Sequence, residues 1–346
     1  MRSATPNVPD WIAGNGPDAD IAVSTRARLA RSLAGFPFPS RASGEDLTMA
    51  ARLVRGACTG LMTRFAHLRS FRVEKLSPVQ RSFLLDARVA STEQMRGGAG
   101  RIVITEPGGA LSIMVNEEDH LRLQAITSGL APREVWELVD WADDVLAEKL
   151  DYGYSGEYGY LTASLSNVGT GLRISVMMHL AGLAMTGGLS ERLRAAYDLG
   201  VSVRGAFGEG SRAAGDMFQV SNEVTLGLPE GEIVEKVRSV AEYLLGEERR
   251  ARKELIGGER NRLTDSAARA VRTLSSSMSV KSGEALTLIS RLRLAAALGF
   301  VEDCPISLVN ELMVSVQAGS GDDGGASIKR AALLRSKVAG VQVVSP

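Results

Sequence analysis

The sequence predicts an α+β protein whose first part, residues 1–228, mixes strands and helices and whose second part, residues 229–346, is helical. β-branched segments separated by glycine- and proline-rich turns predict strands in the first part. Amphipathic segments between them predict helices that pack on those strands. After Pro229 alanine, leucine, arginine and glutamate dominate, and no strand pattern returns until the last residues. We therefore place the division between the two parts near residues 227–230.

Local patterns predict the individual elements. Residues 101–105 and 110–115 are β-branched and enclose Pro107-Gly108-Gly109, which predicts a hairpin. Further strands are predicted at residues 21–28, 201–207 and 217–227, the last two joined by a glycine-rich segment. Helices are predicted at residues 47–65, at 132–150, and from the Gly169/Gly171 turn through Met185. Ser77-Pro78 fits an N-cap followed by proline at the first helical position.

Composition excludes several classes of function. The 346 residues carry 40 basic and 40 acidic side chains, so no net charge favours a nucleic-acid partner or an acidic membrane surface. Cys58 and Cys304 lack metal-ligand spacing and are expected to be reduced thiols. No apolar stretch is long enough for a membrane span, and residues 1–10 do not resemble a signal peptide. We expect a cytoplasmic protein without a metal site formed by its own side chains.

Three separated runs combine arginine with glutamate or with a second arginine. They are residues 24–28 with Arg26 and Arg28, residues 116–122 with Glu118 and Arg122, and residues 204–209 with Arg204 and Glu209. The guanidinium group is always charged and meets phosphate oxygens bidentately, so such arginines suit a polyphosphate. Carboxylates in the same pocket would repel that anion unless they face a cation. The combination predicts two ligands, a nucleotide and a cationic acceptor, and hence phosphoryl transfer to a guanidinium.

Each run also has an ordinary structural interpretation. Arg26 and Arg28, two residues apart on a strand, would share one face, but surface arginines often do so. Glu118 and Arg122 could form a surface ion pair of little energetic value. Residues 204–209 could be a simple hairpin tip. None of the three histidines shows triad or metal spacing, and His120 is expected to serve packing or a local hydrogen bond.

A fourth run, residues 164–173, places Gly169 and Gly171 ahead of Arg173. The glycines allow a tight turn, and the N–H groups at the start of the predicted helix would attract phosphate. The run lacks the Lys-Ser/Thr pair of a P-loop and does not follow the G-x-G-x-x-G pattern. An ordinary turn into a helix with a surface arginine explains it equally well.

Together the four runs resemble the phosphagen (guanidino) kinase family over about residues 21–227. The resemblance implies a central, mainly antiparallel sheet flanked by helices and a site for MgATP and a guanidino acceptor. It implies that the ATP phosphates are bound by the run that contains Ser24 and by Arg26, Arg28, Arg122, Arg173 and Arg204. It also implies that Glu118 and Glu209 hold the acceptor guanidinium, with Glu118 as the base.

Residues 31–39 and 204–227 resemble the bacterial protein-arginine kinases within that family. The arginine run begins near residue 24, which leaves no room for the N-terminal helical domain that encloses small substrates in other members. The resemblance implies that arginine side chains of proteins are the substrates and that the helical C-terminal part serves dimerisation and substrate binding. It further implies a possible activator protein, a Clp-type protease partner and a role in stress responses.

Two departures from the family pattern stand out. Ser164 replaces the family's cysteine and Leu165 the following proline, so a hydroxyl stands where a thiolate is usual. We expect this change to alter activity without abolishing it. Residues 326–331 replace the family's R-D-x-x-R-A run and retain only Lys329 and Arg330 as cations. The alternatives are therefore a kinase of a free guanidino metabolite and a weakly active adaptor that binds phosphoarginine or ATP.

Overall fold

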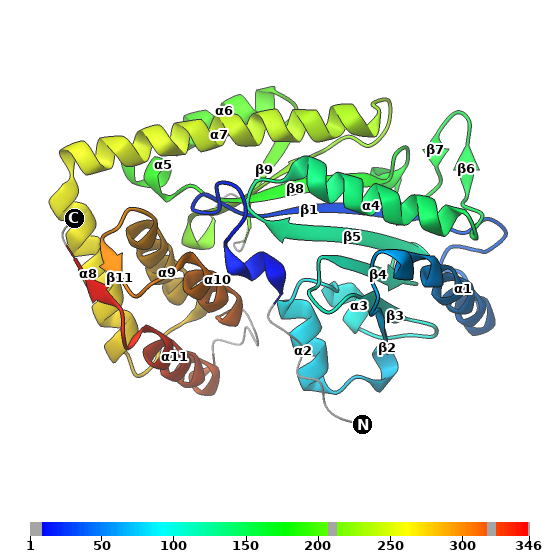
Figure 1. Cartoon of the computed structure of the whole chain (residues 1–346), viewed down its shortest axis with the longest axis horizontal. Helices are drawn as coiled ribbons and strands as arrows, with labels where there is room; N and C mark the ends of the chain where they lie inside the picture. Colours follow the sequence, from blue (N-terminus) through cyan, green and yellow to red (C-terminus); the bar gives the residue numbers. More distant parts are fainter. Residues whose placement is uncertain (1–8, 207–212, 317–322, 345–346) are drawn as a thin grey trace.

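The computed structural model describes residues 9–206, 213–316 and 323–344, and the architecture is shown in Figure 1. Its centre is an eight-stranded sheet of strand order β2-β3-β4-β5-β1-β8-β10-β9, in which all paired strands are antiparallel. The strands are β1 Ala22–Arg31, β2 Arg69–Arg72, β3 Ile102–Thr105, β4 Leu111–Val115, β5 Leu121–Ser128, β8 Leu172–His179, β9 Val201–Gly205 and β10 Met217–Asn222. The predicted mainly antiparallel sheet is confirmed.

Helices surround the sheet and form most of the C-terminal part (Figure 1). They are α1 Gly44–Ala57, α2 Pro78–Asp86, α3 Thr92–Met95, α4 Pro132–Ala147, α5 Ala181–Thr186, α6 Leu189–Asp198, α7 Glu230–Gly258, α8 Arg260–Ser276, α9 Ser282–Ala297, α10 Ile306–Ser315 and α11 Gly324–Val338. The short 3₁₀ turns are η1 Asp10–Ala13, η2 Cys58–Thr63, η3 Val73–Lys75, η4 Leu165–Asn167 and η5 Ala214–Asp216. Two small two-stranded sheets pair β6 Tyr154–Ser155 with β7 Gly159–Tyr160, and β11 Val301–Glu302 with β12 Gln342–Val343.

Local signals explain where several helices begin. Ser43 and Ser77 each close a capping box with the residue three positions on, which satisfies two backbone N–H groups at the helix start. Pro132 occupies the first turn of α4, where the missing N–H costs nothing. The helix predicted at residues 47–65 is shorter than expected, since α1 ends at Ala57 and continues as the 3₁₀ turn η2.

The helix predicted to start at the Gly169/Gly171 turn is wrong. Residues 172–179 form β8, a strand at the centre of the sheet, and only α5 is helical before Met185. The side chains of β8 are mostly buried on both faces of the sheet. The strand therefore lacks the alternation of apolar and polar residues that marks a half-exposed strand. The predicted helix N-terminus for phosphate therefore does not exist.

The two faces of the sheet differ because successive side chains of a strand point to opposite sides. On one face Leu29 of β1 and Val176 of β8 belong to a large apolar core with Val139 of α4 and Val237 of α7. Arg31 also lies on this side, fully buried, and its guanidinium lies 2.7 Å from Asp143 of α4. The opposite face carries the polar side chains that form the site described below.

The C-terminal helices form a second core. Residues of α8, α9, α10 and α11 pack together with Trp11 and Ile12 of the N-terminal turn η1. Helix α7 instead contributes Val237 and Leu244 to the core of the sheet, so it connects the two parts. The predicted division after residue 228 stays a prediction. Among the described helices, none is long and apolar enough to cross a membrane.

Candidate active site

Arginines from three neighbouring strands meet on the polar face of the sheet. Arg28 of β1 is paired directly with Arg173 of β8, and Arg122 of β5 lies opposite Ala30 of β1. Arg26 shares the face with Arg28 because the two are separated by one residue of the strand. The strand register therefore gathers arginines from distant parts of the sequence, because alternate side chains of a strand point to the same side of the sheet.

These side chains surround a pocket of about 330 Å³, a volume typical of small-ligand sites. Its wall is formed by Arg26, Arg28, Leu29, Ala30, Glu118, Arg122, Ser166, Asn167, Gly171, Arg173 and Gln219. The structure thus brings together four of the arginines and one of the glutamates predicted for the site. Ser24 and Ser164 are not among the described residues that line it.

The pocket has an excess of positive charge. Burial and the neighbouring Arg122 and Arg173 lower the pKa of Arg28 to about 9. Burial and the charges of Arg28, Arg88, Arg173 and Arg122, in that order, lower the pKa of Arg26 well below its usual value. Guanidinium groups that repel one another at such short range favour the binding of an anion between them.

A buried donor atom of Arg28 also favours an anionic ligand. Arg28 Nε is buried and has no hydrogen-bond partner within the described ranges. A buried donor without a partner is costly, so it is expected to meet an acceptor when the site is occupied. Phosphate oxygens are suitable acceptors for a guanidinium N–H group.

The turn at residues 116–120 positions the acidic side of the pocket. Asn116 has a left-handed backbone, with φ of 58°, and its side-chain amide donates to Leu47 O at 2.7 Å and Gly100 O at 3.1 Å. Asp119 accepts from Ser32 Oγ at 2.8 Å and from the backbone N–H of Ala163 at 2.7 Å. The turn is therefore tied to both α1 and the segment that leads to Ser164.

His120 completes the turn. Its Nδ1 accepts the backbone N–H of Leu33 at 3.2 Å, and burial lowers its pKa. The local hydrogen-bonding role predicted for His120 is confirmed.

Two adjacent glutamates contact Arg122 in different ways. Glu117 is buried, lies 2.5 Å from Arg122 Nη1 and also accepts from Ser91 Oγ. Glu118 lies 3.5 Å from Arg122 Nη2, 44% of its side chain is exposed, and it lines the pocket. The sequence analysis missed Glu117, because a turn with two consecutive glutamates does not show which one turns inward.

Burial raises the pKa of Glu118, and the negative charges of Asp119, Glu117 and Glu93 add to the effect. Arg122 opposes the shift. A carboxylate with a raised pKa binds a proton more readily, which suits a general base.

Ser164, Ser24 and Arg204 are not among the described residues that line the pocket. Ser164 is half-buried, and its Oγ lies 2.9 Å from Ser166 Oγ, which does line the pocket. Ser24 is buried in β1, opposite Ser128 of β5. Arg204 is exposed at the end of β9, paired with Gln219 of β10. Its charge lowers the pKa of Arg173, although burial is the larger cause. Glu209 lies outside the described residues.

Arg88 is a further cation that the sequence analysis missed. It follows α2 with φ of 58°, its charge acts on Arg26, and its guanidinium lies 5.0 Å from the centre of the Trp11 ring. Burial lowers the pKa of Arg88 to about 10. No local pattern marks this position, because only the packing of α2 against the sheet brings Arg88 near the pocket.

Comparisons with known proteins agree with this geometry. The C-terminal catalytic domain family of the ATP:guanido phosphotransferases matches residues 49–251. The family of protein-arginine kinase McsB C-terminal domains matches residues 260–342. The protein-arginine kinase of Symbiobacterium thermophilum is 37% identical over 341 residues, which cover 95% of this chain and 96% of that protein. That of Moorella thermoacetica is 41% identical over 309 residues, which cover 89% and 88%.

Solved structures of other proteins have a similar fold. The crystal structure of a lombricine kinase superposes with a TM-score of 0.61 at 23% identity and covers 72% of each chain. The substrate-free duplicated taurocyamine kinase from Schistosoma mansoni gives a TM-score of 0.58 at 20% identity, over 72% of this chain and 36% of that one. These likenesses concern the fold alone. On the matches to its sequence, the chain belongs to the ATP:guanido phosphotransferase family, in its protein-arginine kinase branch.

Proposed function

We propose that this protein transfers the γ-phosphoryl group of ATP to arginine side chains of other proteins. The observation that carries the proposal is the pocket that is lined by Arg26, Arg28, Arg122 and Arg173 and also by the partly exposed Glu118. The arginines supply a binding site for a polyphosphate, and the carboxylate supplies a partner for a guanidinium. Full-length relatives called protein-arginine kinase support the choice of substrate.

The residues fit ATP as the phosphoryl donor. The unpartnered Nε of Arg28 and the lowered pKa values of Arg26 and Arg28 match a ligand with several negative charges. Arg204, whose charge reaches Arg173, extends this positive surface toward β9. Ser24 is buried at the start of β1, opposite Ser128 of β5, and in this proposal it belongs with Arg26 and Arg28 to the run that binds the phosphates.

ATP is expected to arrive with Mg²⁺. Within residues 9–206, 213–316 and 323–344 no cluster of three or more His, Cys, Asp or Glu side chains could hold a metal ion. Phosphate oxygens and water would therefore supply most of the ligands of Mg²⁺, as is common for this ion. The ion would neutralise charge on the transferred group, alongside the arginines.

The chain's own residues then account for the chemistry. Arg26, Arg28 and Arg173 hold the donor in place and stabilise the negative charge of the transition state. The acceptor guanidinium has a pKa above about 12, so it must lose a proton as the N–P bond forms. Glu118 binds that guanidinium through its carboxylate and accepts the proton.

Arg122 serves two partners. Its contact with buried Glu117 fixes the guanidinium, and its longer contact leaves Glu118 free to face the acceptor. In this proposal Glu209 is the second carboxylate that orients the acceptor, and Ser164 donates or accepts a hydrogen bond near it. Ser164 is well placed for this role because its hydroxyl contacts Ser166 at the pocket wall.

The proposal extends to partners and location. The C-terminal part, residues 229–346, would form a homodimer and bind substrates, and an activator protein and a Clp-type protease would be partners. The match of residues 260–342 to the C-terminal domain family of protein-arginine kinases supports a role of its own for this part. A cytoplasmic location belongs to the same proposal.

The test is incubation of the purified protein with MgATP and unfolded casein, followed by mass spectrometry at neutral pH to locate phosphoarginine. Phosphoarginine on casein that disappears in Glu118→Gln would support the proposal. Free arginine serves as the competing acceptor, and its phosphorylation without that of casein would favour a metabolite kinase. ATP binding without any transfer would favour an adaptor, the alternative that Ser164 raises.

A further inference from the structure

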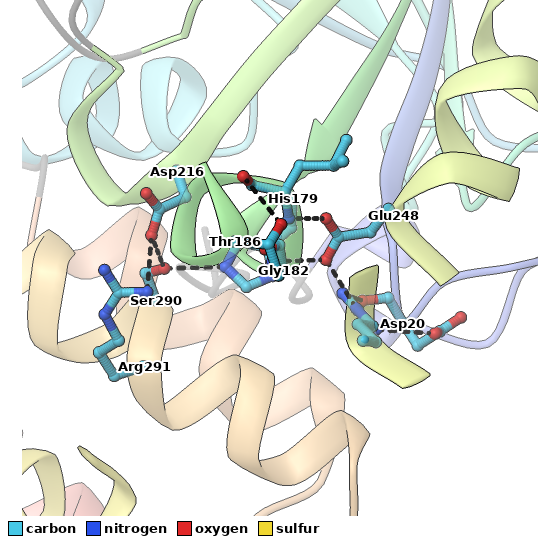
Figure 2. Close-up of polar contacts among 10 residues, drawn as sticks. Asp20, His179, Gly182, Thr186, Asp216, Glu248, Ser290 and Arg291 are labelled. Atoms are coloured by element: carbon cyan, nitrogen blue, oxygen red, sulfur yellow. Dashed lines mark hydrogen bonds and ion pairs between the residues drawn. The ribbon is translucent and has the colours of Figure 1, made fainter. Parts of the chain in front are cut away.

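A buried polar network joins the C-terminal helix α9 to the sheet near the start of β10. Figure 2 shows Asp216, His179, Ser290 and Arg291 meeting between the sheet and this helix. Ser290 and Arg291 are consecutive residues of α9, and both reach the carboxylate of Asp216. The distances to Asp216 Oδ2 are 2.5 Å from Ser290 Oγ and 3.6 Å from Arg291 Nη1.

The hydrogen bonds of the network are donated in sequence, from His179 to Ser290 and from Ser290 to Asp216. The hydroxyl of Ser290 has one proton and donates it to Asp216, so it accepts from His179 Nε2, 2.9 Å away. His179 is therefore neutral with its proton on Nε2, and its buried Nδ1 has no hydrogen-bond partner within the described ranges. Burial and the charges of Arg293, Arg252 and Arg291 lower the pKa of His179, which agrees with the neutral ring.

The backbone at Asp216 is also held in place. Gly215 and Asp216 both have positive φ, 67° and 53°. The carbonyl of Asp216 accepts the N–H of Leu180 at 3.0 Å, directly after His179. A Cβ atom at residue 215 would lie 2.9 Å from Leu286 O of α9, so this turn fits closely against the helix. The start of β10 is thus fixed from two sides, by β8 and by α9.

The strand that begins here borders the active-site pocket. Gln219 of β10 lines the pocket and is paired with Arg204 of β9. Ser221, two residues on, accepts from Arg173 Nη2 at 3.3 Å. A shift at Asp216 would therefore move the strand whose Ser221 side chain contacts Arg173 and whose backbone is paired with that of Arg204.

We propose that Ser290 is a positioning residue for phosphoryl transfer: through Asp216 it fixes β10, and with it Arg173 and Arg204. The C-terminal helical part thereby contributes to the geometry of a pocket that none of its described side chains lines. This inference rests on the proposed function of the pocket. Since the inference concerns alignment of the donor, a displacement of about 1 Å is enough to slow transfer.

The test compares three variants of the full chain. Ser290→Ala removes the hydroxyl, and Asp216→Gly removes the carboxylate at a position where glycine tolerates positive φ. We expect each to raise the KM for ATP and to lower kcat/KM about tenfold or more, because alignment is lost. Asp216→Asn keeps an oxygen that accepts from Ser290 and should retain most of the activity.

The matched control is Thr287→Ala, which removes a hydroxyl of the same helix that donates to Gly283 O within the helix at 3.0 Å. It should leave KM and kcat unchanged. The inference would be overturned if Ser290→Ala lowered the Tm but kept the wild-type KM and kcat at a temperature below its unfolding transition. The network would then contribute to stability alone.

The Kd for MgATP separates this inference from the proposed function. If the wild-type protein binds MgATP but transfers no phosphoryl group to protein, the proposed function fails. A weaker Kd for MgATP in Ser290→Ala and Asp216→Gly would still support the positioning role, and an unchanged Kd would refute it.

Discussion

Arg28 and Arg173 are directly paired across the adjacent strands β1 and β8, on the face of the sheet that carries the pocket. Like charges directly opposite each other destabilise a sheet. Here burial, the charge of Arg122 and the charge of Arg173, in that order, lower the pKa of Arg28 to about 9. A folded protein keeps such a pair where a ligand of opposite charge binds. The repulsion between Arg28 and Arg173 in the free protein is therefore a property of the binding site.

The first prediction concerns this repulsion. Arg28→Gln should lower kcat/KM by about a hundredfold, the effect of losing one preorganised charged donor. The same change should leave the Tm of the nucleotide-free protein unchanged or raise it, since one of the repelling charges is gone. Thermal unfolding with and without MgATP measures both effects, with the exposed Arg96→Gln as the control. A large fall in the Tm of nucleotide-free Arg28→Gln would contradict the interpretation.

The second prediction separates Glu117 from Glu118. Glu118→Gln should lower kcat by at least about a hundredfold, the low end for loss of a general base. Glu117→Gln should mainly raise the KM for ATP, because Glu117 holds Arg122 at 2.5 Å and lies away from the acceptor. Steady-state kinetics with casein as the acceptor distinguishes the two variants. Near-normal turnover in Glu118→Gln would remove that residue from the mechanism.

The third prediction concerns pH. Burial raises the pKa of Glu118, and a general base must be deprotonated to act. Activity should therefore fall as the pH drops through this raised pKa, at a pH above the usual value of about 4.3 for a glutamate. The pH profile of kcat/KM from pH 4 to pH 9 would show this acid limb. Glu118→Asp keeps a carboxylate and should keep an acid limb, whereas a limb that is unchanged in Glu118→Gln would belong to another group.

The fourth prediction concerns Ser164. Its hydroxyl lies 2.9 Å from Ser166 Oγ beside the pocket, and a serine does not ionise at neutral pH. Ser164→Ala should therefore change kcat by less than about tenfold, a smaller loss than that of a general base. Ser164→Cys introduces a group that can become a thiolate and should raise turnover with a new dependence on alkaline pH. Loss of all activity in Ser164→Ala would show that the serine has a larger role.

The fifth prediction concerns the core beneath the site. Arg31 is fully buried, lies 2.7 Å from Asp143 and stacks on the ring of Tyr160 with its carbon 3.5 Å from the ring centre. Asp143→Ala leaves this charge without its partner and should cost about 3–5 kcal/mol of stability. Denaturant unfolding measures the change. A loss below about 1 kcal/mol, the value of a surface pair, would mean that water reaches Arg31.

Local sequence signals predicted much of the fold. The N-cap at Ser77, the hairpin around Gly108 and the alternation of Arg26 and Arg28 depend on neighbouring residues alone. They could therefore be predicted without the tertiary structure. The strand β8 could not, because a strand buried on both faces loses the periodicity that distinguishes it from a helix.

Some features of the candidate site could likewise be predicted from the sequence, whereas others could not. The sequence by itself determined which residue types and runs we propose for the chemistry, including Arg122 and Glu118, because charged groups in apolar or glycine-rich surroundings stand out. Only the tertiary structure decided that Glu117, not Glu118, is the buried partner of Arg122, that Arg88 approaches Arg26, and that Ser290 reaches Asp216. These relationships depend on strand register and helix packing between distant segments, which no local pattern records.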